Sequence, residues 1–70
     1  IAHGVFTDWQ QLLADALRRD GLKPARAKRL AALIVASVEG TVAMCRASRS
    51  AKPLDDVQAE LHGLVETALG

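Results

Sequence analysis

The chain has 70 residues, half of them apolar, and its nine Lys and Arg against eight Asp and Glu leave a formal net charge of +1. This length allows one domain at most, and the balanced charge gives no electrostatic footprint for nucleic acid. A single cysteine excludes an intrachain disulfide. With one Phe, one Trp and no Tyr, the core must be built mainly from Ala, Leu and Val.

The first predicted helix covers residues 5–20. Its apolar residues recur at the three-and-four spacing of one helical face; they are Phe6, Trp9, Leu13, Ala16 and Leu17. Gly21 then provides the left-handed stop that ends many helices, after basic residues in the last turn. Trp9 is either a core residue or a pocket wall, because large amphipathic rings serve both uses.

The second predicted helix covers residues 24–50 and begins at Pro24, which suits a first helical turn. From Ala31 to Cys45 it holds a single charged residue, Glu39. A helix that is apolar nearly all round must be covered on several sides, and the rest of this chain is too short to do so. A membrane span would need about 20 apolar residues, and a mid-span Glu would be costly. The pattern therefore predicts a buried helix in an oligomer or a larger protein.

Small residues share one face of this second helix, namely Ala32, Ala36, Gly40, Ala43 and Ala47. A Gly costs a helix roughly 1 kcal/mol relative to Ala, so Gly40 indicates that another helix approaches closely there. The alternative is that Ala is simply a good helix former. Glu39 needs a partner in such surroundings, and a salt bridge within the chain or across an interface, a wet groove and a ligand contact all remain open.

The third predicted helix covers residues 54–69. Pro53 sets its start, and Asp55 and Asp56 lie in the first turn, where the helix dipole favours acids. Its apolar residues step by three and four like the seam of a coiled coil; they are Leu54, Val57, Leu61, Leu64 and Ala68. Short joints make neighbouring helices antiparallel. The fold class is therefore all-α, with three helices and no strand.

No catalytic or metal-binding pattern is present in the sequence. His3 and His62 belong to no metal-ligand spacing, and we interpret His62 as a surface or packing residue. We expect the hydroxyls of Ser37, Ser48 and Ser50 to bond back to the helix. Without an acid, base and nucleophile set, we predict that the chain is not an enzyme and uses no cofactor or metal.

The order of several short sequence segments along the chain resembles that of a known family. Phe6-x-x-Trp9-x-x-x-Leu13 leads to the Ala-Ser-Val-Glu-Gly segment at residues 36–40, and the Arg-Ala-Ser-Arg segment at 46–49 leads to Pro53-Leu54-Asp55. This arrangement resembles the C-terminal regulatory region of TetR-type bacterial transcriptional regulators, in the branch of the lincomycin-resistance repressor. The resemblance covers nearly the whole chain.

The resemblance implies a three-helix fragment of a cytoplasmic, ligand-responsive repressor, with no membrane contact. Its last two helices would pair with those of a second copy as a four-helix bundle, giving a homodimer. An N-terminal helix-turn-helix domain that is not in this chain would bind operator DNA. An apolar or amphipathic small molecule would be the effector. The alternative is a helical dimerisation or docking module unrelated to transcription.

Two sets of site residues follow from the helix faces. The ligand-binding set lies beside the first helix and comprises Trp9, Leu13, Leu17, Leu33 and Met44. The dimer-interface set comprises Ala32, Ala36, Glu39, Gly40, Ala43, Ala47, Val57, Leu61 and Leu64. A pocket walled by large apolar residues with few polar groups is the usual form of a small-molecule site. The alternative, that the first set fills a solid core, remains open.

Overall fold

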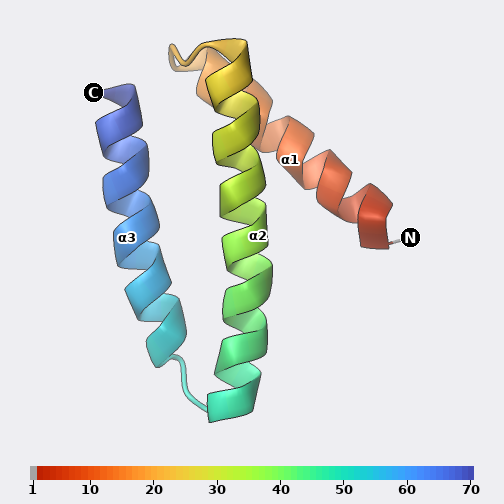
Figure 1. Ribbon diagram of the computed structural model, residues 1–70, viewed down its shortest axis with the longest axis vertical. Helices are drawn as coiled ribbons and strands as arrows, with labels where there is room; N and C mark the ends of the chain where they lie inside the picture. Colours follow the sequence, from red (N-terminus) through yellow and green to blue (C-terminus); the bar gives the residue numbers. More distant parts are fainter. Residues whose placement is uncertain (1) are drawn as a thin grey trace.

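A computed structural model describes the backbone of residues 2–70 and the side chains of residues 4–70, so the side chain of His3 lies outside the described part. Over this range the chain forms three helices and no strand (Figure 1). They are α1 (Ala2–Arg19), α2 (Pro24–Ser48) and α3 (Lys52–Leu69). The prediction of an all-α chain with three helices is confirmed.

The end of α1 is set by Gly21, as the sequence predicted. Gly21 has a φ of 113°, which side chains other than hydrogen rarely allow. Its N–H donates to the Arg18 carbonyl at 3.0 Å, and the Leu22 N–H donates to the Leu17 carbonyl at 3.1 Å. These are the two bonds of a Schellman motif. Leu22 also packs against the cluster that contains Leu17, which adds the apolar contact typical of this motif.

The other helix boundaries differ from the predicted ones by a few residues. Helix α1 begins at Ala2 rather than near residue 5. Gly4 does not prevent this earlier start, since a Gly costs a helix only about 1 kcal/mol relative to Ala. Helix α2 ends at Ser48 rather than at residue 50, because Arg49 adopts a left-handed conformation with a φ of 52°. The Ser50 N–H then donates to the Cys45 carbonyl at 3.2 Å and closes the helix.

Arg49→Gly is expected to stabilise the protein. A left-handed conformation costs a residue with a Cβ roughly 1–2 kcal/mol, and Gly avoids this cost while losing more chain entropy on folding. We expect a net gain of about 1 kcal/mol in the free energy of unfolding, measured by urea denaturation. Ala47→Gly, two residues earlier and still within the helix, is the control and should lose about 1 kcal/mol. A loss for Arg49→Gly would contradict the left-handed assignment.

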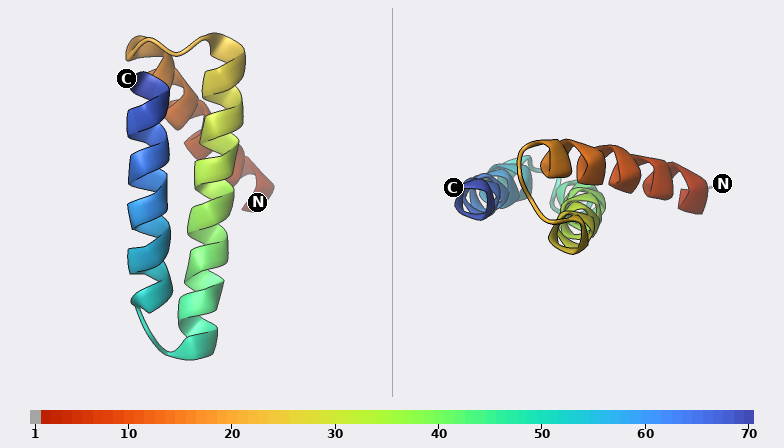
Figure 2. Two further views of the ribbon diagram at one scale, coloured as in Figure 1. Left: turned by 60° about the vertical axis from the view of Figure 1, so that its left-hand side comes forward. Right: turned by 90° about the horizontal axis from the view of Figure 1, so that it is seen from above.

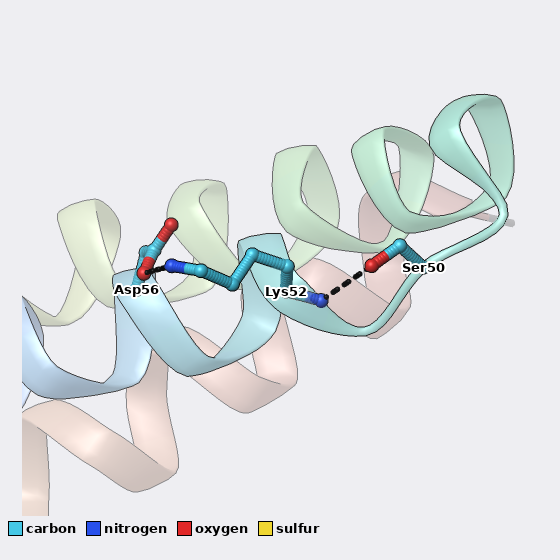
Figure 3. Close-up of polar contacts among 3 residues, drawn as sticks. All are labelled: Ser50, Lys52 and Asp56. Carbon is cyan, nitrogen blue, oxygen red and sulfur yellow. Dashed lines mark hydrogen bonds and ion pairs between the residues drawn. The ribbon is translucent and has the colours of Figure 1, made fainter.

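Helix α3 begins at Lys52, two residues before the predicted start, with Pro53 in its first turn. The Ser50 hydroxyl accepts the Lys52 backbone N–H at 3.0 Å, and the Lys52 ammonium pairs with Asp56 one turn later (Figure 3). The hydrogen bond to Asp56 raises the pKa of Lys52 above its usual 10.5. This contribution to stability is therefore complete below pH 10.5 and is lost as the pH rises through the higher folded-state pKa.

The C-terminal end of α1 meets the N-terminal end of α2 at one end of the molecule, and towards the other end α1 alone diverges while α3 stays beside α2 (Figures 1 and 2). Helix α3 runs antiparallel beside α2, whereas α1 crosses α2 obliquely and points away from α3 towards its N-terminus (Figures 1 and 2). The core lies where the C-terminal half of α1 meets the N-terminal half of α2. It is a small cluster of Ala14, Leu17, Ala27, Leu30 and Ala31, with Leu64, Val65 and Ala68 of α3 packed at its edge.

This arrangement is open and flat. The Cα atoms span 37 × 32 × 13 Å, and their radius of gyration is 12.9 Å, against about 11 Å for a compact domain of this length. The accessible surface is 5187 Å², whereas a compact monomer of 7.4 kDa exposes about 4200 Å². The chain therefore exposes about 1000 Å² more than a self-contained domain of its mass does.

Candidate functional site

An apolar groove runs between α2 and α3 in the half of the molecule away from the core. Its volume is about 390 Å³. Helix α2 contributes Ile34, Val38 and Thr41, while α3 contributes Leu54, Val57, Gln58, Leu61, His62 and Val65. On each helix these residues recur at three-and-four spacing, so two regular helical faces form the walls. We call this site the α2–α3 groove.

A second hollow, of about 230 Å³, lies between α1 and α2. Its walls are Trp9, Leu12 and Leu13 of α1 with Ile34, Val35 and Val38 of α2. Ile34 and Val38 line this α1–α2 hollow and the α2–α3 groove alike. The two hollows therefore lie on either side of one ridge of α2 and form a continuous apolar surface beside the point where α1 diverges from α2.

Polar groups are few in the α2–α3 groove. Thr41 is only 2% exposed, and its hydroxyl donates to the Ser37 carbonyl at 2.6 Å. His62 lies at the edge of the groove, where its Nδ1 is 3.1 Å from the Glu66 carboxylate. Gln58, one turn before His62, is the third polar side chain and carries an amide. A surface of this kind suits an apolar ligand that a few polar contacts orient.

The opposite side of α2 is exposed and also apolar. The small residues Ala36, Gly40, Ala43 and Ala47 face solvent there, and we call them the small-residue stripe. Leu33 and Met44 flank it, with 47% and 55% of their surfaces exposed. A Cβ added at Gly40 would meet no atom within 4 Å. Nothing within a single copy of the chain therefore requires a Gly at this position.

The structure brings together only part of the predicted ligand-binding set. Trp9 and Leu13 line the α1–α2 hollow. Leu17 is buried in the core with 6% of its surface exposed. Leu33 and Met44 lie on the stripe side of α2, so the larger α2 residues that Trp9 meets are different from those expected. The ring of Trp9 also contacts Phe6, with centroids 6.1 Å apart.

The predicted dimer set divides between two surfaces. The small-residue stripe is open to solvent, and Ala32 and Glu39 at its edge are half-buried. Val57, Leu61 and Leu64 of the α3 seam are half-buried and turn towards α2 of the same chain. Glu39 makes no ion pair with any residue of the described part. A salt bridge within the chain, one of the alternatives left open for Glu39, is therefore not formed among these residues.

Sequence reasoning missed the α2 residues that form the floor of both hollows, Ile34 and Val38, and the buried Thr41. A helical wheel separates the sides of α2 correctly, but it does not tell which side meets α1 and which meets α3. A usable signal was present, because Ile34, Val38 and Thr41 follow one another at four and three residues.

The smaller polar expectations turn out as follows. The Ser48 hydroxyl donates to the Met44 carbonyl at 2.9 Å, which confirms that it bonds back to the helix. Ser50 instead accepts a hydrogen bond at the start of α3. Cys45 is half-buried and free. Within the described residues, no three His, Cys, Asp or Glu side chains lie close enough to hold a metal ion.

Helix α2 is also long and apolar enough to cross a membrane, by length and composition alone. Only 22% of its most apolar stretch is buried within this chain. Core helices of soluble proteins pass the same test, so this property by itself is weak support for a membrane span. Glu39 and Gly40 lie near the middle of the helix, where a charge in lipid would be costly.

Comparison with known proteins supports the resemblance drawn from the sequence. Residues 1–60 match the TetR-type family described as transcriptional regulator LmrA/YxaF-like, C-terminal domain. Two HTH-type transcriptional regulators of Mycobacterium tuberculosis, one from strain CDC 1551 / Oshkosh and one from strain H37Rv, are each 38% identical over 64 residues. The alignment covers 91% of this chain but 33% of each relative, so the chain spans about a third of their length. No solved structure matches it.

Proposed function

We propose that this chain, which belongs to the LmrA/YxaF-like family of TetR-type transcriptional regulators and corresponds to their C-terminal domain, provides homodimerisation and part of an effector pocket. The family establishes the regulatory role in general terms. We further propose that the full protein is a cytoplasmic repressor and that a helix-turn-helix domain outside this chain binds its operator DNA. It assigns no catalytic activity and no cofactor to the chain.

The observation that carries the proposal is that α2 presents apolar residues on two opposite sides. On one side, the small-residue stripe allows the backbone of another helix to come close. A two-fold interface must be self-complementary, and a stripe of small residues can pack against its own copy. The excess exposed area of about 1000 Å² is comparable with the roughly 800 Å² that each partner buries in a standard interface.

On the other side of α2, the two hollows are suited to a small molecule. The α2–α3 groove, at about 390 Å³, falls within the roughly 300–1000 Å³ of typical ligand sites. Trp9 and Leu13, which the sequence suggested for ligand binding, line the adjoining α1–α2 hollow. An apolar or amphipathic effector lying across the ridge of Ile34 and Val38 would contact all three helices.

Binding of an effector is expected to change the fluorescence of Trp9. The indole is 45% exposed beside the α1–α2 hollow, so a bound apolar molecule would exclude water from it and shift its emission to shorter wavelength. The measurement is a fluorescence titration of the full natural protein with compounds that release it from operator DNA. Trp9→Phe, which keeps an aromatic wall, is the control and should remove the shift while operator release remains.

Two outcomes would contradict this proposal. One is a full-length protein that sediments as a monomer at micromolar concentration. The other is operator release by a compound that leaves the Trp9 emission unchanged and binds Val38→Trp as tightly as the natural protein. The first outcome would refute the proposed dimer and the second would refute the proposed pocket, so the two parts of the proposal are tested separately.

A further inference from the structure

Two of the three polar side chains that line the α2–α3 groove, Thr41 and His62, share one property: a hydrogen that each carries is already donated within the chain. The Thr41 hydroxyl has a single hydrogen, which it donates to the Ser37 carbonyl at 2.6 Å. What remains to Thr41 Oγ1 is its capacity to accept a hydrogen bond. Thr41 lines the groove with only 2% of its surface exposed, so a ligand has to lie directly against this floor to meet the acceptor.

His62, at the edge of the groove, also donates a hydrogen within the chain. The contact of 3.1 Å between its Nδ1 and the Glu66 carboxylate requires a hydrogen on Nδ1, since a carboxylate only accepts. In the neutral ring, the hydrogen bond at Nδ1 leaves Nε2 as an acceptor. Glu66 also adds a negative charge beside this edge, one turn beyond His62.

We propose that the effector is an apolar molecule whose polar end carries hydrogen-bond donors, such as hydroxyl or amine groups, and that Thr41 and His62 determine this preference. The inference rests on the effector role proposed above and names the class of ligand. A carboxylate placed beside Thr41 and His62 would give up its hydration and find acceptors there instead of donors, which is costly. Repulsion from Glu66 would add to that cost. The Gln58 amide carries both donors and an acceptor, so it does not favour one kind of polar end over the other.

The test compares three probes with the same apolar tail, namely octanol, octylamine and octanoate. Each is titrated by calorimetry into the full natural protein at neutral pH. We expect octanol and octylamine to bind at least about tenfold more tightly than octanoate, because an unpaired polar group in an apolar site loses about that factor or more. Octanoate binding as tightly as octanol would overturn the proposal while leaving the pocket in place.

Two variants connect the preference to the residues. Thr41→Val keeps the shape of the side chain, removes the acceptor, and should weaken octanol about three- to tenfold with little change for octanoate. His62→Phe should do the same for octylamine. The control is Ser48→Ala, because Ser48 on the same helix also donates to the carbonyl four residues before it but does not line the groove.

The outcomes separate this inference from the proposed function. If Thr41→Val leaves the affinity for octanol unchanged and His62→Phe leaves the affinity for octylamine unchanged, the assignment of the preference to these residues is wrong. If none of the probes binds, or if Val38→Trp leaves their binding unchanged, the groove is not an effector site, and the proposed pocket is refuted together with the inference.

Discussion

Gly40→Leu is expected to weaken the proposed homodimer strongly. Overpacking a close contact costs typically 1–3 kcal/mol, and a two-fold interface carries the substitution twice. The dimer constant should therefore weaken by about 2–6 kcal/mol, which is at least about thirtyfold. Sedimentation equilibrium of the full natural protein, followed over a range of concentrations, measures this change.

Within a single copy of the chain, Gly40→Leu is expected to stabilise α2, which is the opposite of its expected effect on the dimer. A Cβ at Gly40 meets nothing within the chain, and Leu is a better helix former than Gly by roughly 0.8 kcal/mol. Only a contact from outside this chain can turn the substitution into a loss, and a weakened dimer constant would assign that contact to a second copy. Ala59→Leu is the control, since Ala59 is exposed and lies on the side of α3 opposite Leu61. An unchanged dimer constant for Gly40→Leu would place the interface elsewhere.

Val38→Trp is expected to weaken binding of the proposed effector strongly. Val38 lines both hollows, so an indole at this position would fill the space on either side of the ridge. Displacing a ligand from a packed site in this way should cost about 1–3 kcal/mol, which corresponds to about 5- to 150-fold in affinity. Titration of the effector against operator release measures the loss.

Val42→Trp provides a matched control for this prediction. Val42 lies one turn further along α2, is 41% exposed against 43% for Val38, and lines neither hollow. The same change in size and hydrophobicity should therefore leave the effector affinity nearly unchanged. Equal losses for the two variants would mean that the damage comes from α2 as a whole and not from a filled pocket.

The helix ends show how much of the fold the sequence could predict. Gly21, Pro24 and Pro53 mark boundaries through backbone constraints that act within a few residues, and the structure has a boundary at each. The end of α2 was placed two residues late, because Arg49 takes a left-handed conformation that usually belongs to Gly. A left-handed conformation at a residue other than Gly or Asn is not visible in the local sequence pattern.

The candidate site was harder to predict, because it depends on the direction from which α1 and α3 approach α2. Leu33 and Ile34 are adjacent and equally apolar, yet Leu33 is on the stripe side and Ile34 lines both hollows. Their side chains leave the helix about 100° apart, and propensity does not distinguish them. The small-residue stripe was recognised because its composition is unusual, whereas the groove is made of ordinary core residues.

The position of α2 between its two apolar sides has a consequence for regulation. Val38 and Gly40 are two residues apart, so their side-chain directions differ by about 200° around one rigid helix. No second layer of structure separates the groove from the stripe, and a rotation or tilt of α2 that admits a ligand would move the surface offered to a second copy. Thermodynamic coupling of this kind is reciprocal. If the effector changes the self-association constant by some factor, self-association must change the affinity for the effector by the same factor, and effector sensitivity would then depend on how much of the protein the cell contains.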